Sequence, residues 1–339
     1  MKKSILVLGG AGYIGSHTVV ELVNAGYEPI IVDDLSNSQA NALKGIEKIV
    51  GKRIKFHKGN CGDEQFLRKV FKSEKTIDGC VHFAAFKAVG ESIKEPLKYY
   101  ENNLGTLIVL LKVMQEFGVV NLVFSSSATV YGQPGQLPIT ENMASQPAAS
   151  PYGATKIMSE RIIEDVVKSG VTLKAVSLRY FNPIGAHASA HIGELPKGVP
   201  NNLVPFVTQV AAGIRDKLVI FGKDYNTPDG TTVRDYIHVV DLAQAHVRAF
   251  EFLEQKPQSS FYEAFNIGTG VGVSVLEIIK TFEEVAGVKL NYELGERRAG
   301  DVEKIFASVD KAKKVLGWQP KLTLRQALLD SWNWQKSLK

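Results

Sequence analysis

The stretch SILVLGGAGYIGSHTVVELVNAG, residues 4–26, places a cluster of glycines between a short apolar run and a longer amphipathic pattern. The apolar run predicts a buried strand, and the helical spacing that ends at Gly26 predicts a helix. Gly9, Gly12 and Gly15 lie between the two at the spacing G-x-x-G-x-x-G. Glycine lets the backbone turn sharply and approach a pyrophosphate, and the helix N-terminus offers unpaired N–H groups. The stretch predicts a dinucleotide-binding loop; the alternative is a tight turn that binds nothing.

A second apolar run, YEPIIVDDL at residues 27–35, predicts the next buried strand and ends in two aspartates. Asp33 lies about 20 residues beyond the glycines, where a carboxylate would bind the ribose of a dinucleotide. A carboxylate at this place favours a free 2′-hydroxyl, so the expected cofactor is NAD and not NADP.

Strands and helices continue to alternate as far as the strand predicted at residues 173–181. This alternation predicts βαβ units and an α/β fold with a Rossmann-like, doubly wound parallel sheet. The pattern weakens in NPIGAHASAHIGELPKGVPNN, residues 182–202, which is rich in Pro, Gly and Asn. Because 339 residues suit two domains, we expect an NAD-binding Rossmann domain at 1–181 and a smaller α/β substrate domain at 182–339.

The composition excludes several classes of protein. A hydrophobic content of 45% with 22% charged residues is that of a globular chain, and the net charge of +5 comes without a basic block, so no nucleic-acid partner is expected. No apolar stretch approaches the ~20 residues that span a bilayer, and the N-terminus lacks a signal-peptide pattern. Cys61 and Cys80 predict neither a metal site nor a disulfide. We therefore expect a cytoplasmic protein with reduced thiols, no metal and no membrane partner.

Two motifs suggest proton transfer. In SPYGATK, residues 150–156, Tyr152 and Lys156 project from the same face of a helix whose first turn contains Pro151. In FSSSATVYG, residues 124–132, Ser127 ends a buried strand, where parallel sheets bind ligands. A free tyrosine has a pKa near ~10, but an ammonium group and an oxidised nicotinamide would both favour its phenolate. The alternatives are a solvated helix face for the pair and an ordinary hydroxyl-capped turn for Ser127.

The motifs together resemble a known family. GGAGYIG, SSSATVYG and YGATK are similar to the extended short-chain dehydrogenase/reductase superfamily. HFAAFKAVGES, LRYFNPIGAH, GVPNNLVPF and FGKDYNTPDGTTVRDYIHVVDLA narrow the resemblance to the UDP-glucose 4-epimerase family, from Leu6 to Trp334.

The resemblance implies that UDP-glucose and UDP-galactose are interconverted by transient oxidation at the sugar 4-position, with tightly bound NAD that is not consumed. Tyr152 would remove the 4-hydroxyl proton, Ser127 would bond the reacting oxygen, and Lys156 would bind the nicotinamide ribose. The hydride would return to the opposite face of a 4-keto sugar that has turned in the site. The resemblance also implies a UDP-hexose substrate and a homodimer.

Further site residues follow from the resemblance position by position. Arg234 and Arg298 would bind the pyrophosphate, Asp301 the uridine ribose, and Ile305 would limit the group at the sugar 2-position. The full cofactor set is Gly9, Gly12, Tyr13, Ile14, Gly15, Asp33, Asn60, Cys61, Phe83, Ala84, Lys87, Asn102, Tyr152, Lys156 and Tyr180. The full substrate set is Ser127, Tyr152, Asn182, Asn202, Val219, Phe221, Arg234, Arg298, Asp301 and Ile305.

Other interpretations stay open at this point. Arg234 beside Asp235 is also typical of a surface ion pair, Asn202 of a turn, and Lys87 of a solvated side chain. Asn60 stands where the family usually has an aspartate, and its carbonyl oxygen can still accept a hydrogen bond. A competing enzyme is a sugar-nucleotide 4,6-dehydratase, but such relatives carry Asp-Glu where this chain has Ala128 and Thr129. A different class of alternative is a non-catalytic NAD-binding sensor, which would have no need of Tyr152 and Lys156.

Overall fold

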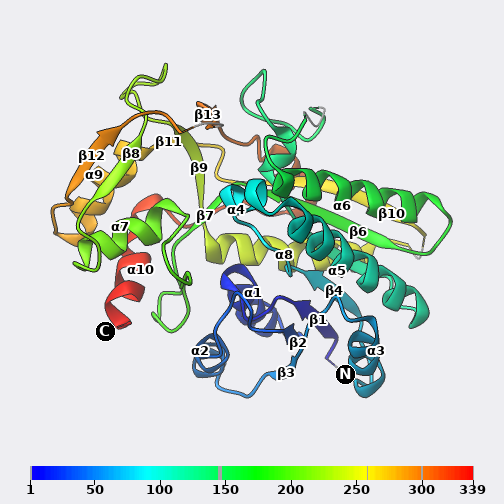
Figure 1. Ribbon diagram of the computed structural model, residues 1–339. Helices are drawn as coiled ribbons and strands as arrows, with labels where there is room; N and C mark the ends of the chain where they lie inside the picture. The colour runs from blue at the N-terminus through cyan, green and yellow to red at the C-terminus, as the bar shows by residue number, and fades with distance from the viewer. Residues whose placement is uncertain (1, 144–146, 258, 299–300, 339) are drawn as a thin grey trace.

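The computed structural model describes residues 2–143, 147–257, 259–298 and 301–338. Its centre is a parallel seven-stranded sheet in the order β10-β6-β5-β4-β1-β2-β3 (Figure 1). This confirms the predicted Rossmann-like fold, in which the carboxyl ends of neighbouring strands meet at one edge. The strands are β1 (Ser4–Leu8), β2 (Glu28–Asp33), β3 (Lys55–Lys58), β4 (Gly79–His82), β5 (Asn121–Ser127), β6 (Lys174–Tyr180) and β10 (Phe261–Ile267).

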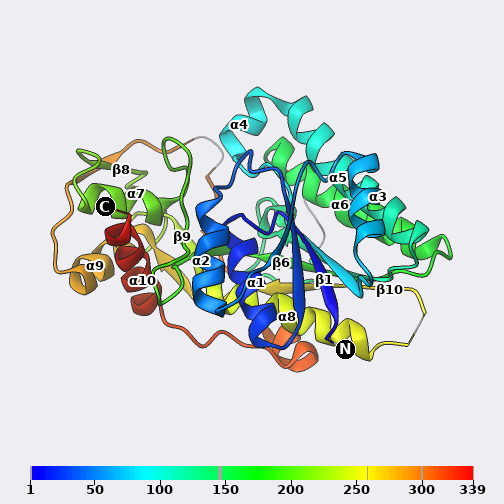
Figure 2. The same cartoon turned by 90° about the horizontal axis from the view of Figure 1, so that it is seen from below.

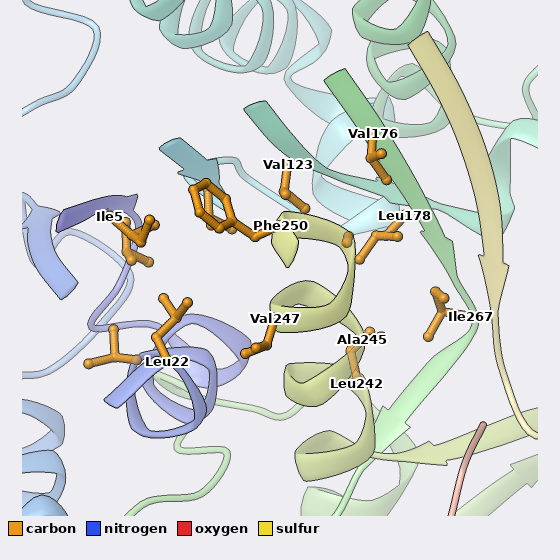
Figure 3. Close-up of a cluster of buried hydrophobic side chains, with 14 of the residues drawn as sticks. Ile5, Leu22, Val123, Val176, Leu178, Leu242, Ala245, Val247, Phe250 and Ile267 are labelled. Atoms are coloured by element: carbon orange, nitrogen blue, oxygen red, sulfur yellow. The ribbon is translucent and has the colours of Figure 1, made fainter. Parts of the chain in front are cut away.

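Helices cover both faces of this sheet, because successive residues of each buried strand point to opposite sides. Ile5 and Val7 of β1 belong to the apolar cluster under one helical layer, and Leu6 and Leu8 belong to the cluster under the other. Figure 3 shows the first cluster, where Phe250 and Val247 lie between the strands and Leu22. That layer contains α1 (Tyr13–Asn24), α2 (Asn41–Val50) and α8 (Val239–Gln255), and the opposite layer contains α3 (Glu64–Ser73), α5 (Pro96–Glu116) and α6 (Pro151–Lys168).

The remaining elements form a smaller unit at the end of the molecule that carries the C-terminus (Figures 1 and 2). Its core lies between helices and short strands, and Phe282 and Trp332 pack edge to face there. Its strands are β7 (Asn182–Ile184), β8 (Leu218–Phe221), β9 (Val233–His238), β11 (Gly272–Ser274), β12 (Tyr292–Gly295) and β13 (Lys304–Ile305). The helices are α7 (Leu203–Ala211), α9 (Val275–Ala286) and α10 (Leu324–Ser337), and the chain also forms α4 (Val89–Lys94), the short 3₁₀ turn η1 (Ala128–Tyr131) and the turn η2 (Ala312–Leu316).

The chain does not leave the central sheet for good at residue 181. After β9 it returns as α8, which covers one face of the sheet, and then as β10, which pairs with β6 at the sheet edge. β9 ends at His238 and α8 begins at Val239, so no loop separates them. The two units are therefore interleaved along the sequence.

Among the helices in the described parts of the chain, none combines the length and apolarity needed to cross a membrane.

Candidate active site

The backbone of the glycine loop leaves room for a ligand to approach it closely. Gly9 has a φ of +79°, and a Cβ atom there would lie 2.8 Å from the backbone nitrogen of Ala84. A Cβ atom on Gly15 would lie 2.3 Å from the carbonyl oxygen of Gly9. α1 begins directly after this loop without a side-chain cap, so its first N–H groups remain free. The cradle and the free donors fit the pyrophosphate of a dinucleotide.

Asp33 ends β2 beside this cradle, and its carboxylate is buried. One oxygen accepts from the Ala11 backbone N–H at 3.0 Å, and the other from the Leu35 N–H at 2.9 Å and the Ser38 hydroxyl at 2.7 Å. These bonds fix the carboxylate where β2 meets the glycine loop. A carboxylate has about four acceptor positions, so it retains capacity for a ribose hydroxyl.

A cleft of about 1040 Å³ runs along the carboxyl ends of the strands. Every residue predicted for the cofactor lines it, and Ser127, Asn182 and Asn202 line it too. Asn60 also lies at this wall, where its side-chain oxygen accepts from the Gly62 N–H at 2.8 Å. The cleft therefore brings the predicted dinucleotide residues and part of the predicted sugar residues to one place.

Tyr152 and Lys156 lie inside the molecule, not on a solvated helix face. Ser150 caps α6 by accepting from the Gly153 N–H at 3.2 Å. The first turn then carries Tyr152 and Lys156 to the cleft wall, where only 8% and 4% of their surfaces are exposed. The Lys156 ammonium donates to the carbonyl oxygen of Ser125 at 2.7 Å. The surface interpretation of this pair is wrong.

Burial dominates the proton affinities of this pair. It raises the pKa of Tyr152, and the hydrogen bond with Ser127 acts in the opposite direction. Burial lowers the pKa of Lys156 to about 8, against the opposing charge of Glu160. Tyr152 is consequently a neutral phenol near neutral pH in the protein alone, and Lys156 still carries a proton in most molecules at pH 7.

Ser127 serves both a turn and the cleft. Its hydroxyl oxygen accepts from the Thr129 N–H at 3.2 Å, as in a hydroxyl-capped turn. The same side chain lines the cleft beside Tyr152. The two interpretations of this serine are therefore compatible.

A second group of predicted residues gathers around Asp301, outside the walls of the main cleft. The Asp301 carboxylate accepts from Arg298 at 2.7 Å and lies 3.9 Å from the Arg234 guanidinium. The Arg298 guanidinium lies 5.8 Å from the ring centre of Phe221. Burial lowers the pKa of Arg234, so this guanidinium is short of compensating partners. Val219 lies on β8 with Phe221, paired with Glu293 of β12.

Asp235 is not the surface partner of Arg234. It is completely buried and accepts from the backbone N–H groups of Thr269, Gly270 and Ala307 at 2.7, 3.0 and 3.2 Å. The carboxylate thereby joins β9 to the segment that follows β13.

Ile305 lies on β13, close to the hydrogen bond by which Asp235 connects β9 to Ala307. It pairs with Arg234 across the β9–β13 ladder and is buried in the apolar cluster that contains Ala128 and Phe181. Those two residues adjoin Ser127 and Asn182 of the cleft. The predicted limit on the sugar therefore lies between the arginine group and the cleft.

Residues 186–202, which we call the strap, form part of the wall of the cleft from residue 192 onward. One side-chain oxygen of Glu194 accepts from Lys87 at 3.0 Å and from Asn202 at 2.6 Å. Its backbone oxygen accepts from the indole of Trp334 at 2.9 Å. Lys87, although half exposed, and Asn202 are therefore held by the same carboxylate at the wall of the cleft.

The other end of the strap is tied to the Asp33 loop. The Lys197 ammonium donates to the carbonyl oxygens of Leu35 at 3.0 Å and Ser36 at 2.6 Å. Ile192, two residues before Glu194, is buried in the same cluster as Ile46 of α2. The middle of the strap is thus held against the cofactor side at Ile192, Glu194 and Lys197.

Comparisons with known proteins identify the family. The chain is 51% identical to a UDP-glucose 4-epimerase of Bacillus subtilis over 334 residues, which cover 98% of this chain and 97% of that protein. A crystal structure of UDP-glucose 4-epimerase from Bifidobacterium longum, in complex with NAD+ and UDP, matches with a TM-score of 0.94 at 46% identity, over 99% of this chain and 98% of that one. The chain belongs to the UDP-glucose 4-epimerase family. The resemblance inferred from the motifs is thereby confirmed.

Two further matches place this family in context. The UDP-glucose 4-epimerase of Stenotrophomonas maltophila, with bound NAD and formylated UDP-arabinopyranose, matches with a TM-score of 0.95 at 45% identity, over 99% of this chain and 98% of that one. A family model described as GDP-mannose 4,6 dehydratase matches residues 6–330. In this epimerase-family chain Ala128 and Thr129 follow Ser127, and neither side chain can act as the acid or base that elimination of water requires.

Sequence reasoning missed three residues of this epimerase-family site. Ser125 holds Lys156 through its carbonyl oxygen and bonds Tyr180 through its hydroxyl at 2.5 Å. Asn103 is buried and donates to the Phe86 carbonyl at 3.0 Å and the Thr155 hydroxyl at 3.2 Å, which joins α5 and α6 beneath the cleft. Glu194 of the strap is the third. The serine lay within a quoted motif, but no sequence signal marked the asparagine or the glutamate.

Proposed function

We propose that this protein is an NAD-dependent UDP-glucose 4-epimerase that interconverts UDP-glucose and UDP-galactose through a 4-keto sugar. The observation that carries the proposal is the buried set of Ser127, Tyr152 and Lys156 on the wall of a cleft that also contains the glycine cradle. NAD held by the glycine cradle and Asp33 would supply reversible hydride transfer at the sugar C4, and its positive charge would favour the Tyr152 phenolate.

Tyr152 is the general base for the 4-hydroxyl and returns the proton when the keto group is reduced. Ser127 lies beside it and bonds the same sugar oxygen, which limits where that oxygen can lie. Lys156 is fixed by Ser125 at 2.7 Å, and its ammonium lies 5.9 Å from the ring centre of Tyr152, so its charge would act on the phenol and on the nicotinamide ribose. Near a buried phenolate, such a charge is little screened by water.

The smaller unit, whose residues all come from 182–339, would hold the nucleotide. Arg234 and Arg298 would bind the pyrophosphate, because planar guanidinium groups match phosphate oxygens with two bonds each. Asp301 lies between them and would bind the uridine ribose, while Val219 and Phe221 of β8 flank the base. Asn182 and Asn202 reach the sugar from the cleft. Residues 1–181 would hold most of the cofactor.

We further infer a homodimer built on the layer of α4, α5 and α6. These helices expose several large apolar side chains to solvent, and Leu97 leaves 79% of its surface uncovered. The others are Val89, Ile93, Ile108 and Met158. Apolar side chains gathered on one face are typical of a protein interface. The buried thiols of Cys61 and Cys80 are unpaired, which agrees with a reducing, cytoplasmic location.

The test uses the purified protein, UDP-galactose and no added cofactor. We expect UDP-glucose to accumulate up to an equilibrium mixture, and chromatography of the nucleotide sugars measures it. Denatured protein should release NAD into the supernatant. A 4-keto-6-deoxy product would indicate a dehydratase instead. No product from NAD-loaded protein would favour the non-catalytic sensor.

A further inference from the structure

Glu160 is a buried carboxylate one helical turn after Lys156 on α6. Its oxygens accept from the Ser126 hydroxyl at 2.5 Å and from the Arg179 guanidinium at 2.6 and 3.0 Å. The bonds join α6 to β5 and β6 directly behind the cleft wall. A buried carboxylate in such a bidentate pair is held in one orientation.

Ser126 connects the Glu160 carboxylate to the residues that line the cleft. Ser126 lies between Ser125, whose carbonyl oxygen holds the Lys156 ammonium, and Ser127, which lines the cleft. Glu160 therefore fixes the end of β5 against the same helix that carries Lys156 and Tyr152. A shift of α6 relative to the end of β5 would change the distances among Ser127, Tyr152 and Lys156.

Arg179, the partner of Glu160, is held by further hydrogen bonds. Arg179 also donates to the Tyr131 hydroxyl at 3.0 Å, and that hydroxyl donates to Asn266 at 2.6 Å. The Asn266 backbone N–H bonds the Glu141 carboxylate at 2.8 Å. The pair consequently has no freedom to turn away from β5.

We propose that Glu160 is a positioning residue for this reaction: through Ser126 and Arg179 it fixes Ser127 and Lys156 relative to Tyr152. The Glu160 charge also opposes the effect of burial on the pKa of Lys156. The inference rests on the proposed epimerase activity, because it assigns a role within that proton transfer. Glu160 itself does not touch the substrate.

The other groups around Lys156 do not supply this charge. Burial lowers the pKa of His82 to about 3, so this histidine is neutral. Burial raises the pKa values of Tyr152, Tyr180, Tyr131 and Tyr262, so these phenols are neutral at pH 7. The charged groups that face the contact of α6 with β5 and β6 from the packed elements are Arg179 on β6, Glu160 on α6 and Glu141 beyond η1.

Glu160→Gln tests the charge, because it keeps the shape and leaves an oxygen for Ser126. Without the carboxylate, Lys156 loses its proton more easily and supports the phenolate less. We expect the midpoint of the alkaline limb of kcat against pH, where Lys156 loses its proton, to fall by about one unit, so that kcat for UDP-galactose above pH 8 falls by up to about 10-fold. KM and the NAD content should stay near those of the unchanged protein.

Arg179→Gln should shift the midpoint of the pH profile in the opposite direction. Removing the cation leaves the Glu160 charge uncompensated, so Lys156 holds its proton more tightly and the alkaline midpoint should move to higher pH. General damage to the site cannot move the midpoint in opposite directions in the two variants.

Two control variants complete the design. Glu164→Gln changes an exposed carboxylate further along the same helix, paired with Lys168 at 3.3 Å, and should leave the profile unchanged. Ser126→Ala removes one bond and no charge, so it should lower kcat without moving the midpoint. An unmoved midpoint in Glu160→Gln, with the unchanged protein active, overturns this inference alone. Inactivity of the unchanged protein would instead count against the proposed function.

Discussion

Tyr152, the proposed general base, shows how strongly the surroundings of a side chain decide what it can do. The spacing of Tyr152 and Lys156 is equally compatible with a solvated helix face, and only the packing of α6 against β5 buries both side chains. Removing the phenolic hydroxyl in Tyr152→Phe should lower kcat by about 100-fold to 10,000-fold, the usual contribution of a positioned acid or base. Steady-state turnover of UDP-galactose measures it, with NAD content as the control for folding. Near-normal turnover would show that another group takes the proton.

Ile305 gives a second prediction at this scale, on substrate range. Its side chain is stiff because it is branched at Cβ, and it is packed in the cluster that adjoins Ser127 and Asn182. We expect UDP-glucose and UDP-galactose as main substrates and slow turnover of N-acetylated forms. A few carbons in a pocket are worth ~1–3 kcal/mol of discrimination. Ile305→Ser should therefore raise kcat/KM for UDP-N-acetylgalactosamine relative to UDP-galactose by roughly 10-fold or more.

The control for this test is Ile305→Val, which keeps the branched shape and should change the ratio little. Both kcat/KM values are measured for each protein. If the ratio is the same in all of them, Ile305 does not limit the sugar.

At the scale of elements, we predict that the strap slows the release of NAD. Its Lys197 ammonium donates to two carbonyl oxygens of the loop that follows Asp33. Hydrogen bonds of a charged donor are worth about 1.5–3 kcal/mol, so Lys197→Met should speed the loss of NAD by roughly 10-fold or more. Dialysis against charcoal, with NAD assayed over time, measures this rate.

Lys217→Met is the matched control, because Lys217 forms an exposed ion pair with Glu293 in the smaller unit. It should retain NAD like the unchanged protein. If Lys197→Met retains NAD equally well, the strap does not limit release.

Elements differ in how far the sequence predicts them. The glycine loop was predictable because its physics is local: a strand, a tight turn and a helix follow one another in sequence. The alternation of strands and helices likewise predicted the parallel sheet. The run FYEAFNI of β10 carries no sign of which sheet it will join, and its pairing with β6 depends on a crossover through α8. Glu194 and Glu160 escaped notice for the same reason, since their partners lie far away in sequence.

The interleaving of the two units predicts the behaviour of the whole molecule when it is cut. A fragment of residues 1–181 lacks β10 and α8, which cover the edge of β6 and the apolar face that includes Val176 and Leu178. An uncovered edge strand and face favour aggregation. We expect the fragment to show no cooperative unfolding transition, measured by circular dichroism beside the intact chain. A sharp transition in the fragment would contradict this.

The uninterrupted passage from β9 into α8 has a mechanical consequence. β9 carries Arg234, and α8 lies against the sheet that bears the cofactor cradle, so one uninterrupted segment connects the proposed nucleotide site to the cofactor half. Because no loop separates the two elements, few backbone torsions are available to move one half away from the other. In the proposed reaction, the hexose would then turn between a nucleotide site and a nicotinamide site that keep their positions. The inversion would require rotation of the substrate and no opening of the two units.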